Sequence, residues 1–186
     1  MANKDAAFGL QPIGKVGQNR DAQGLSEYSI AASSTAIYQN DPVKMANTGE
    51  IEVGAAAEVL LGSLNGVFFT DATTSKPTYA NHLKAANTAT DIVGFVSDDP
   101  YERFEVQSAG TVAQTNIGNC ADISYSAGSS PNFVSKTEIS GTMAAGAAQL
   151  KIMGVSKDPD NNELGSANAN VVVTINEHFL KQTAGI

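Results

Sequence analysis

Residues 91–107, DIVGFVSDDPYERFEVQ, contain two short apolar runs on either side of an Asp-Asp-Pro turn signal. In the second run, the polar residues Arg103 and Glu105 alternate with Phe104 and Val106. Because successive side chains of a strand point to opposite faces, this alternation predicts a strand with one buried face. The segment is therefore predicted to form two β-strands joined at the Asp-Asp-Pro turn.

Signals for short strands recur on both sides of this segment. SEYSIA at 26–31 and GEIEVG at 49–54 alternate polar and apolar residues, and an Asp-Pro step breaks AIYQNDPVKM at 36–45. Further runs follow in QLKIMGV at 149–155 and NVVVTINEHFLK at 170–181. Many short strands with Gly, Asn, Asp and Pro between them predict an all-β fold, a barrel or a jelly-roll-like sandwich.

Turns and helices are predicted at only a few places. Asn65-Gly66 lies between two apolar runs in residues 58–72, which predicts a hairpin turn. The two helical candidates are short, TYANHLKAA at 78–86 and GTMAAGAAQ at 141–149. We therefore expect little helix, limited to one or two short turns.

Composition narrows the possible functions. The chain of 186 residues has a formal net charge of −8, one cysteine and no tryptophan, and aromatic residues make up 6%. The negative charge argues against a nucleic-acid-binding module, and a single cysteine cannot form an internal disulfide. No apolar run approaches the roughly 20 residues needed to span a bilayer, so we expect a soluble product without a membrane partner.

Residues 1–25 differ from the rest of the sequence. Glycines interrupt isolated apolar residues, and neither a helical nor a strand period holds across the stretch. Two interpretations remain open, a disordered terminus and an extended arm that lies on a neighbouring molecule. The second makes Phe8, Leu10, Pro12 and Ile13 the partner-binding anchors. Residues 26–186 are then a single β-rich domain, with a subdivision near 111–130 as a further option.

The few residues that can do chemistry do not form a known motif. If residues 170–181 are extended, Glu177 and His178 point to opposite faces, so we expect a structural or rim histidine and a glutamate in water. His82 has no carboxylate or cysteine beside it in the sequence, and a spatial pair between Cys120 and either histidine stays open. No catalytic residue, cofactor site or enzymatic activity is predicted.

The acidic turn KDPDNNELG at 157–165 has some likeness to a calcium-binding loop. Asp158, Asp160, Asn162 and Glu163 offer oxygen ligands. The later glutamate and the flanking helices of such a loop are missing, and Pro159 interrupts the spacing. We therefore predict a solvated turn and no metal site, and leave open whether the turn takes up a cation.

Four stretches together resemble the head-decoration, or cement, proteins of tailed bacteriophages. These stretches are MANKDAAFGLQPIGK at 1–15, DIVGFVSDDPYERFEVQ at 91–107, AAQLKIMGVSKDPDNNELG at 147–165 and ANVVVTINEHFL at 169–180. The resemblance implies a β-rich structural protein of the virion, made in the host cytoplasm. Its partner would be the major capsid protein, because such proteins bind the outer capsid surface and reinforce junctions between capsid subunits.

Self-association is also expected of such a protein. A homotrimer would match the local threefold positions of a capsid lattice, and a dimer is the second choice. The alternative function, from a different class, is a carbohydrate-binding or adhesion module of a tail fibre or host-recognition structure. A cysteine or serine hydrolase comes third.

Overall fold

The computed structural model describes residues 2–17 and 24–182. Within these residues it contains thirteen β-strands and two single-turn 3₁₀ helices. The strands are β1 (Gln11–Lys15), β2 (Ser26–Ser29), β3 (Pro42–Met45), β4 (Ile51–Val53), β5 (Gly62–Thr70), β6 (Pro77–Ala80), β7 (Val93–Ser97), β8 (Glu102–Gln107), β9 (Cys120–Ala121), β10 (Ile123–Ser124), β11 (Glu138–Ile139), β12 (Leu150–Val155) and β13 (Asn170–Ile175). The helices are η1 (Gln114–Asn116) and η2 (Phe179–Lys181). The all-β prediction is confirmed, and the sheets remain open.

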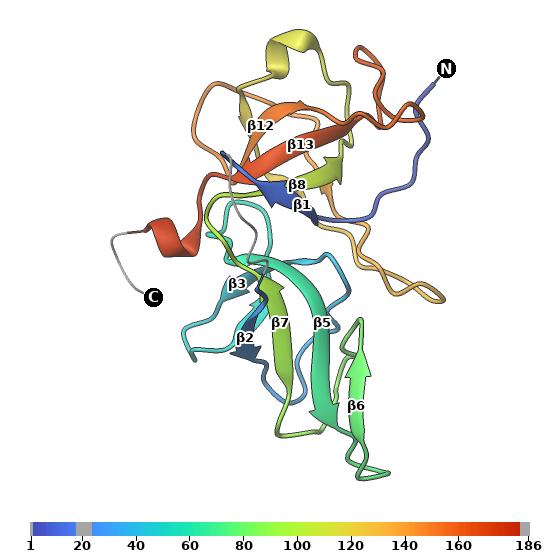
Figure 1. Cartoon of the computed structure of the whole chain (residues 1–186), viewed down its shortest axis with the longest axis vertical. Coiled ribbons are helices and arrows are strands. Elements are labelled where there is room, and N and C mark those ends of the chain that lie inside the picture. Colours follow the sequence, from blue (N-terminus) through green and yellow to red (C-terminus); the bar gives the residue numbers. More distant parts are fainter. Residues whose placement is uncertain (1, 18–23, 183–186) are drawn as a thin grey trace.

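The strands form two main antiparallel sheets, each in its own lobe (Figure 1). Sheet A has the order β1-β8-β13-β12-β9 and lies in lobe A, at the top of Figure 1. Sheet B has the order β2-β7-β5-β3-β4, with β6 paired to β5, and lies in lobe B below. A small third sheet pairs β10 with β11.

The two strands predicted in residues 91–107 are confirmed, but they belong to different sheets. β7 lies between β2 and β5 in sheet B, and β8 lies between β1 and β13 in sheet A. The Asp98-Asp99-Pro100 turn therefore carries the chain from one lobe to the other. One passage between the lobes lies at this turn, whereas the suggested subdivision near 111–130 falls inside lobe A.

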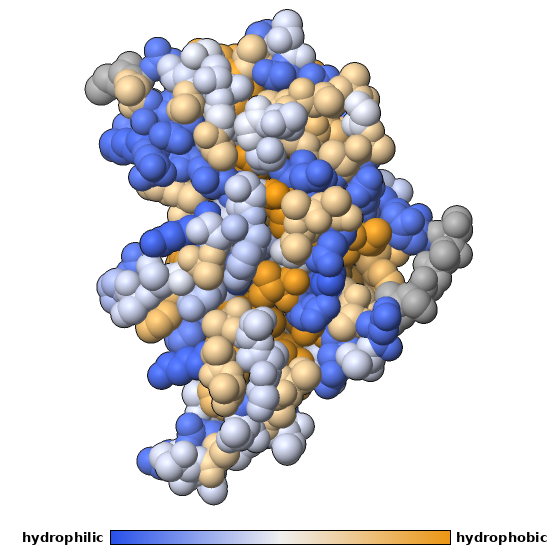
Figure 2. Space-filling model, turned by 180° about the vertical axis from the view of Figure 1, so that it is seen from behind, coloured by the Kyte–Doolittle hydropathy of each residue, from blue (hydrophilic) through white to orange (hydrophobic). Residues whose placement is uncertain are grey.

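Each lobe has its own hydrophobic core. Where the lobes meet, a residue from each lobe packs in or against the core of the other. Leu60 lies between β4 and β5 of sheet B, but its side chain is fully buried in the core of lobe A. Phe179 follows β13 of sheet A and packs against the core of lobe B. The two segments are joined by hydrogen bonds from Leu60 N to the Glu177 carbonyl (3.0 Å) and from Phe179 N to the Leu60 carbonyl (2.8 Å). Figure 2 shows hydrophobic residues concentrated in the middle of the back face, between the lobes.

Three local predictions from the sequence are wrong. Asn65-Gly66 is not a hairpin turn, because β5 runs through it with a register shift against β7 between Leu64 and Gly66. This shift is a β-bulge, in which an extra residue bends a continuous strand. Residues 78–86 do not form a helix but contribute β6, and residues 141–149 contain neither a helix nor a named strand.

Part of the segment 1–25 belongs to the fold of its own subunit, and one of the four predicted anchors is buried there. β1 pairs with β8 along the edge of sheet A, and Leu10 is fully buried in the core of lobe A. The register of β1 shifts between Pro12 and Gly14, and this shift conceals the strand period in the sequence. Residues 18–23 of the predicted arm lie outside the described residues.

Candidate functional site

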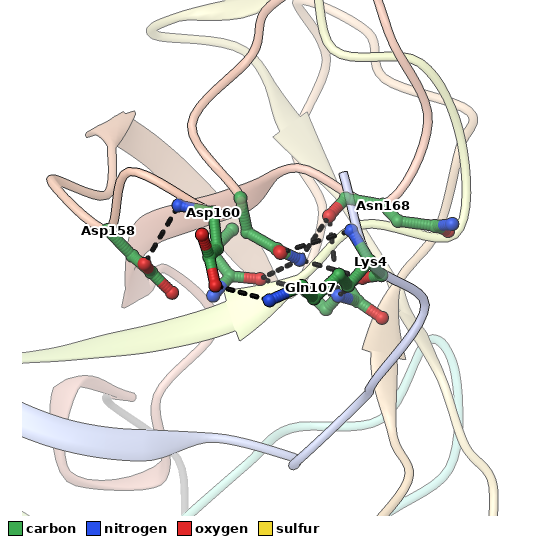
Figure 3. A network of polar contacts seen from close by, with 7 residues as sticks. Lys4, Gln107, Asp158, Asp160 and Asn168 are labelled. Carbon is green, nitrogen blue, oxygen red and sulfur yellow. Dashed lines mark hydrogen bonds and ion pairs between the residues drawn. The ribbon is translucent and has the colours of Figure 1, made fainter. Parts of the chain in front are cut away.

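The N-terminal segment is held on lobe A by a network of side-chain amides (Figure 3). Gln107, fully buried at the end of β8, donates from Nε2 to the Lys4 carbonyl (2.8 Å) and accepts from Ala6 N (2.9 Å) at Oε1. Asn161 donates to the same Lys4 carbonyl (2.8 Å) and accepts from Lys4 N (3.1 Å). The Lys4 side chain forms an ion pair with Asp160. The Lys4 amide and carbonyl and the Ala6 amide are therefore satisfied within the chain.

The next residues of the segment pass between the lobes. Leu10 N donates to the Asn40 carbonyl (2.9 Å), and the Leu10 carbonyl accepts from Ser63 Oγ (2.6 Å). Gly9 has φ of +76°, and a Cβ there would lie 2.3 Å from the Asn40 carbonyl oxygen and 2.5 Å from Ser135 Cβ. Only a glycine fits this passage without a shift of the backbone.

The four predicted anchors are therefore not brought together on one surface. Leu10 faces the core of lobe A, and Phe8 and Pro12 are half-buried. Only Ile13 is exposed, at 42%. Leu10 cannot act as a partner-binding anchor in this structure, whereas Ile13 lies on the face of sheet A that points away from the core.

That outer face of sheet A contains the candidate site, a groove of about 690 Å³. We call it the sheet-A groove. Its apolar lining comes from three segments that are far apart in sequence: Ile13 and Val16, Met153 and Val155, and Val172. Met153 and Val16 are exposed to 45% and 44%, so apolar side chains are open to solvent on this face of the sheet.

Charged residues surround the apolar floor of the groove. Arg103 and Glu105 of β8 lie beside it, and Lys157 and Asp158 line it after β12. Opposite charges around an apolar centre are the usual arrangement of protein–protein interfaces, in which a polar rim surrounds an apolar core. The groove is suited to receiving an apolar side chain or segment of another protein.

The lining of the groove was only partly foreseeable. Ile13 was among the predicted partner-binding residues, but Met153, Val155 and Val172 were not. The available signal was that β12 and β13 carry apolar residues on both faces: Ile152 and Val173 are buried in the core, whereas Met153 and Val172 face the groove. Strands that are apolar on both faces are typical of sheets covered on both sides.

Glu177 and His178 do not form a site. β13 ends at Ile175, and His178 caps the start of η2, where its Nδ1 accepts a hydrogen bond from Leu180 N (3.1 Å). The His178 ring is 1% exposed, and burial lowers its pKa to about 4. Lys181 lowers the pKa further, whereas Asp98 and Asp99 oppose the shift. The prediction of a structural histidine agrees with this position under the turn between the lobes.

Asp41 is a second buried titratable group near the contact between the lobes. It is fully buried, and its carboxylate accepts a hydrogen bond from Tyr38 N (2.8 Å). Burial raises the pKa of Asp41 to about 6, from an ordinary value of 3.8. Because the folded protein then binds a proton more readily than the unfolded chain, the contribution of Asp41 to stability falls as pH rises from about 4 to 6.

The Asp41 and His178 contributions oppose each other between pH 4 and 6.5, and single variants should separate them. The folded pKa of His178 lies below its ordinary 6.5, so its contribution rises with pH in this window. Each contribution is on the order of 2–3 kcal/mol. We expect Asp41→Asn to lose more stability than the unaltered protein on acidification from pH 6.5 to 4, and His178→Asn to lose less. Urea unfolding across this range measures both, and curves parallel to that of the unaltered protein would contradict the assignment.

His82 is held by stacking in lobe B. Its ring lies 3.9 Å from the Phe133 ring, centroid to centroid, at an interplanar angle of 4°, and its Nδ1 is 3.0 Å from Asn81 Oδ1. Burial lowers its pKa. Cys120 lies in β9 of sheet A, and within the described part of the chain it has no hydrogen bond to either histidine. The open option of a Cys-His pair gains no support from this geometry.

The acidic turn at 157–165 serves the N-terminal network described above. Asp160 contacts Lys4, and Asn3 accepts from Glu163 N (3.1 Å) while donating to the Glu163 carbonyl (3.0 Å). Among residues 2–17 and 24–182, no group of three or more His, Cys, Asp and Glu residues is placed to hold a metal ion. The same residues contain no helix long and apolar enough to cross a membrane.

Comparisons with protein-family models, with curated proteins and with solved structures gave no match to the chain.

Proposed function

We propose that this chain is a structural protein of a tailed-phage virion that binds the outer surface of the capsid and reinforces junctions between major capsid protein subunits. The observation that carries the proposal is the sheet-A groove. It leaves Ile13, Val16 and Met153 open to solvent on a sheet whose other face is a complete core. The resemblance of four stretches of the sequence to phage decoration proteins supports the identity of the partner.

A protein partner fits this groove better than a substrate does. Burying an apolar side chain contributes about 1.5–3 kcal/mol, so covering the exposed parts of Ile13, Val16 and Met153 provides part of a modest binding energy. A modest contact is sufficient on a capsid, because repeated attachment multiplies weak contacts through effective concentration. Contacts of this kind reinforce a shell without any chemistry in the attached protein.

Capsid binding in this proposal does not depend on a free N-terminal arm. Residues 3–10 are hydrogen-bonded within their own chain, so the segment contributes Ile13 and Val16 as fixed parts of the groove. The protein therefore binds with a preformed face and avoids most of the cost of ordering a flexible segment, about 1–2 kcal/mol per residue.

Charge placed in the groove should abolish decoration. We expect Met153→Glu to lower occupancy on capsids that lack this protein at least tenfold, because binding would bury an unpaired carboxylate. The measurement is co-sedimentation of purified protein with the capsids, followed by quantification of the bound fraction. Val59→Glu is the matched control, since Val59 is 38% exposed and lies outside the groove.

The outcomes of this experiment show whether the groove or another surface attaches the protein to the capsid. Loss of binding with Met153→Glu but not with Val59→Glu supports the groove. If both variants decorate capsids as well as the unaltered protein does, the groove is not the attachment surface. If the unaltered protein itself fails to sediment with any capsid of its producing virus, the proposed function is wrong.

Self-association belongs to the same proposal. A homotrimer at local threefold positions of the lattice is the state we favour, and a dimer is the second choice, because closed rotational symmetry is the common form of protein assemblies. The mass of the free protein in solution distinguishes the two.

A further inference from the structure

The bulge at Asn65-Gly66 creates a second concave surface, on the outer face of sheet B. Gly66 is paired with Phe95 of β7, and its missing side chain leaves bare backbone between Phe95 and the neighbouring strand β6. A Cβ at Gly66 would lie 3.0 Å from the Ala80 carbonyl oxygen, so a larger residue would fill this floor. The resulting cavity of about 370 Å³ is lined by Tyr79 and Phe95, among other residues.

Tyr79, which lines this cavity, lies beside two other aromatic rings. Tyr79 is 75% exposed, an unusual degree for a large aromatic residue in a strand. Its ring lies 4.8 Å from that of Phe68, its cross-strand partner, and 6.4 Å from that of Phe95 at an interplanar angle of 17°. Tyr79 therefore contacts two phenylalanine rings and still exposes most of its surface to solvent.

Side-chain amides form the rest of the cavity wall, and two of them have unused hydrogen-bonding groups. Asn65 is exposed on the bulge, and within the described residues its side chain has no hydrogen bond. Gln39 accepts only a long contact from Asn81 Nδ2 (3.4 Å), which leaves its own amide NH₂ group without a partner in the same residues. Each amide offers both donors and an acceptor. None of the described residues that line the cavity carries a charge.

We infer that this surface, the Tyr79 shelf, binds an uncharged sugar ring. The C–H bonds on one face of a pyranose are weakly positive and pack on the negative face of an aromatic ring. Its hydroxyl groups both donate and accept hydrogen bonds, as the amides of Asn65 and Gln39 do. The cavity volume falls within the range of small-ligand sites, about 300–1,000 Å³. The absence of charge among the lining residues selects a neutral saccharide over sialylated or sulfated ones.

The shelf and the sheet-A groove are separate surfaces. β6, which carries Tyr79, lies at the end of the molecule far from β12 and β13, which line the groove (Figure 1). A protein attached through the groove therefore leaves the shelf free for a sugar at the other end. The inference does not depend on the proposed capsid function, and either can fail without the other.

An array of oligosaccharides tests the inference, with neutral chains that end in glucose, galactose, mannose or N-acetylglucosamine and with sialylated and sulfated chains for comparison. We expect at least one neutral chain to bind, with calorimetry on that chain giving the affinity. Tyr79→Ala should weaken binding at least tenfold and Asn65→Ala at least threefold. Tyr101→Ala is the matched control, because Tyr101 is 63% exposed but lies in the turn before β8, away from the shelf.

Every other result overturns the inference. Binding of no neutral chain, or binding that Tyr79→Ala leaves unchanged, excludes a sugar site at the shelf. If Tyr79→Ala instead lowers the oligomeric mass of the protein, the shelf is a contact between copies of the chain. Because both altered side chains are exposed, melting temperatures of the variants should stay close to that of the unaltered protein, which excludes misfolding as the cause of lost binding.

Discussion

Replacing Leu10 by alanine is expected to lower the free energy of unfolding by about 2–5 kcal/mol, the usual cost of removing a buried leucine side chain. The side chain is fully buried in the core of lobe A, and its backbone joins Asn40 and Ser63 of lobe B. The cavity left by the substitution would lie close to the contact between the lobes. Urea unfolding followed by circular dichroism measures the loss.

Ile13→Ala is the matched control for this prediction. Ile13 lies three residues further along the same segment but is 42% exposed, so its truncation should cost less than about 1 kcal/mol. Equal stability losses in the two variants would contradict the structure of the segment. A negligible loss for Leu10→Ala would indicate that the N-terminal segment is a free arm. Capsid occupancy should respond in the opposite order, with Ile13→Ala more affected at equal amounts of folded protein.

The strands could be predicted from the sequence because their side-chain alternation is a local property. β4 has Ile51 buried and Glu52 exposed, and β13 has Val171, Val173 and Ile175 buried, as the period of two requires. The separation of β7 and β8 into two sheets was not foreseeable in this way. Pairing partners are set by contacts between segments far apart in the chain, and a turn with Asp and Pro serves a hairpin as well as a passage between lobes.

The N-terminal segment was misjudged because its binding partners are distant in sequence. Lys4 is held by Asn161 and Gln107, more than a hundred residues away. Hydrogen bonds from asparagine and glutamine side chains to the backbone hold this segment in place. Such contacts do not require apolar residues at regular spacing, so the sequence of the segment shows no hydrophobic period. A register shift in β1 at Pro12 and Gly14 removes the remaining alternation.

Two other errors have a common physical cause, the priority of tertiary pairing over local propensity. Asn-Gly favours a two-residue hairpin, but the strand continues because both halves of β5 pair with β7. The alanine-rich residues 141–149 favour helix by composition, but Ala144 instead pairs with Cys120 in an isolated β-bridge. The structure assigns no helix there.

Only part of the sheet-A groove could be predicted from the sequence. Apolar residues on both faces of β12 and β13 indicate two covered faces, and this pattern stands in the sequence. That Ile13 and Val16 join them depends on the pairing of β1 with β8, which the sequence does not reveal. The Tyr79 shelf depends in the same way on the bulge at Asn65-Gly66.

Gln149 joins the two lobes through a fully buried side chain, and its replacement by leucine is expected to destabilise their contact. Its Nε2 donates to the carbonyls of Ala55 (2.7 Å) and Glu58 (2.6 Å) in lobe B, and its Oε1 accepts from Ile123 N (3.0 Å) in lobe A. Leucine has a similar volume but offers neither donors nor an acceptor. The Ile123 amide would then be left buried without a partner, a cost of about 1–3 kcal/mol by itself.

With the two lost bonds to lobe B, we expect Gln149→Leu to lower the free energy of unfolding by about 2–4 kcal/mol. Gln114→Leu is the control, because Gln114 is an exposed glutamine of η1 and its substitution should change stability by less than about 0.5 kcal/mol. The shape of the urea curve gives a second readout. Since the lobes share Leu60, Phe179 and the N-terminal segment, the unaltered protein should unfold in one transition. If Gln149 couples the lobes, its loss should broaden that transition or divide it in two, whereas a curve that only shifts along the urea axis would show that the shared segments hold the lobes together without it.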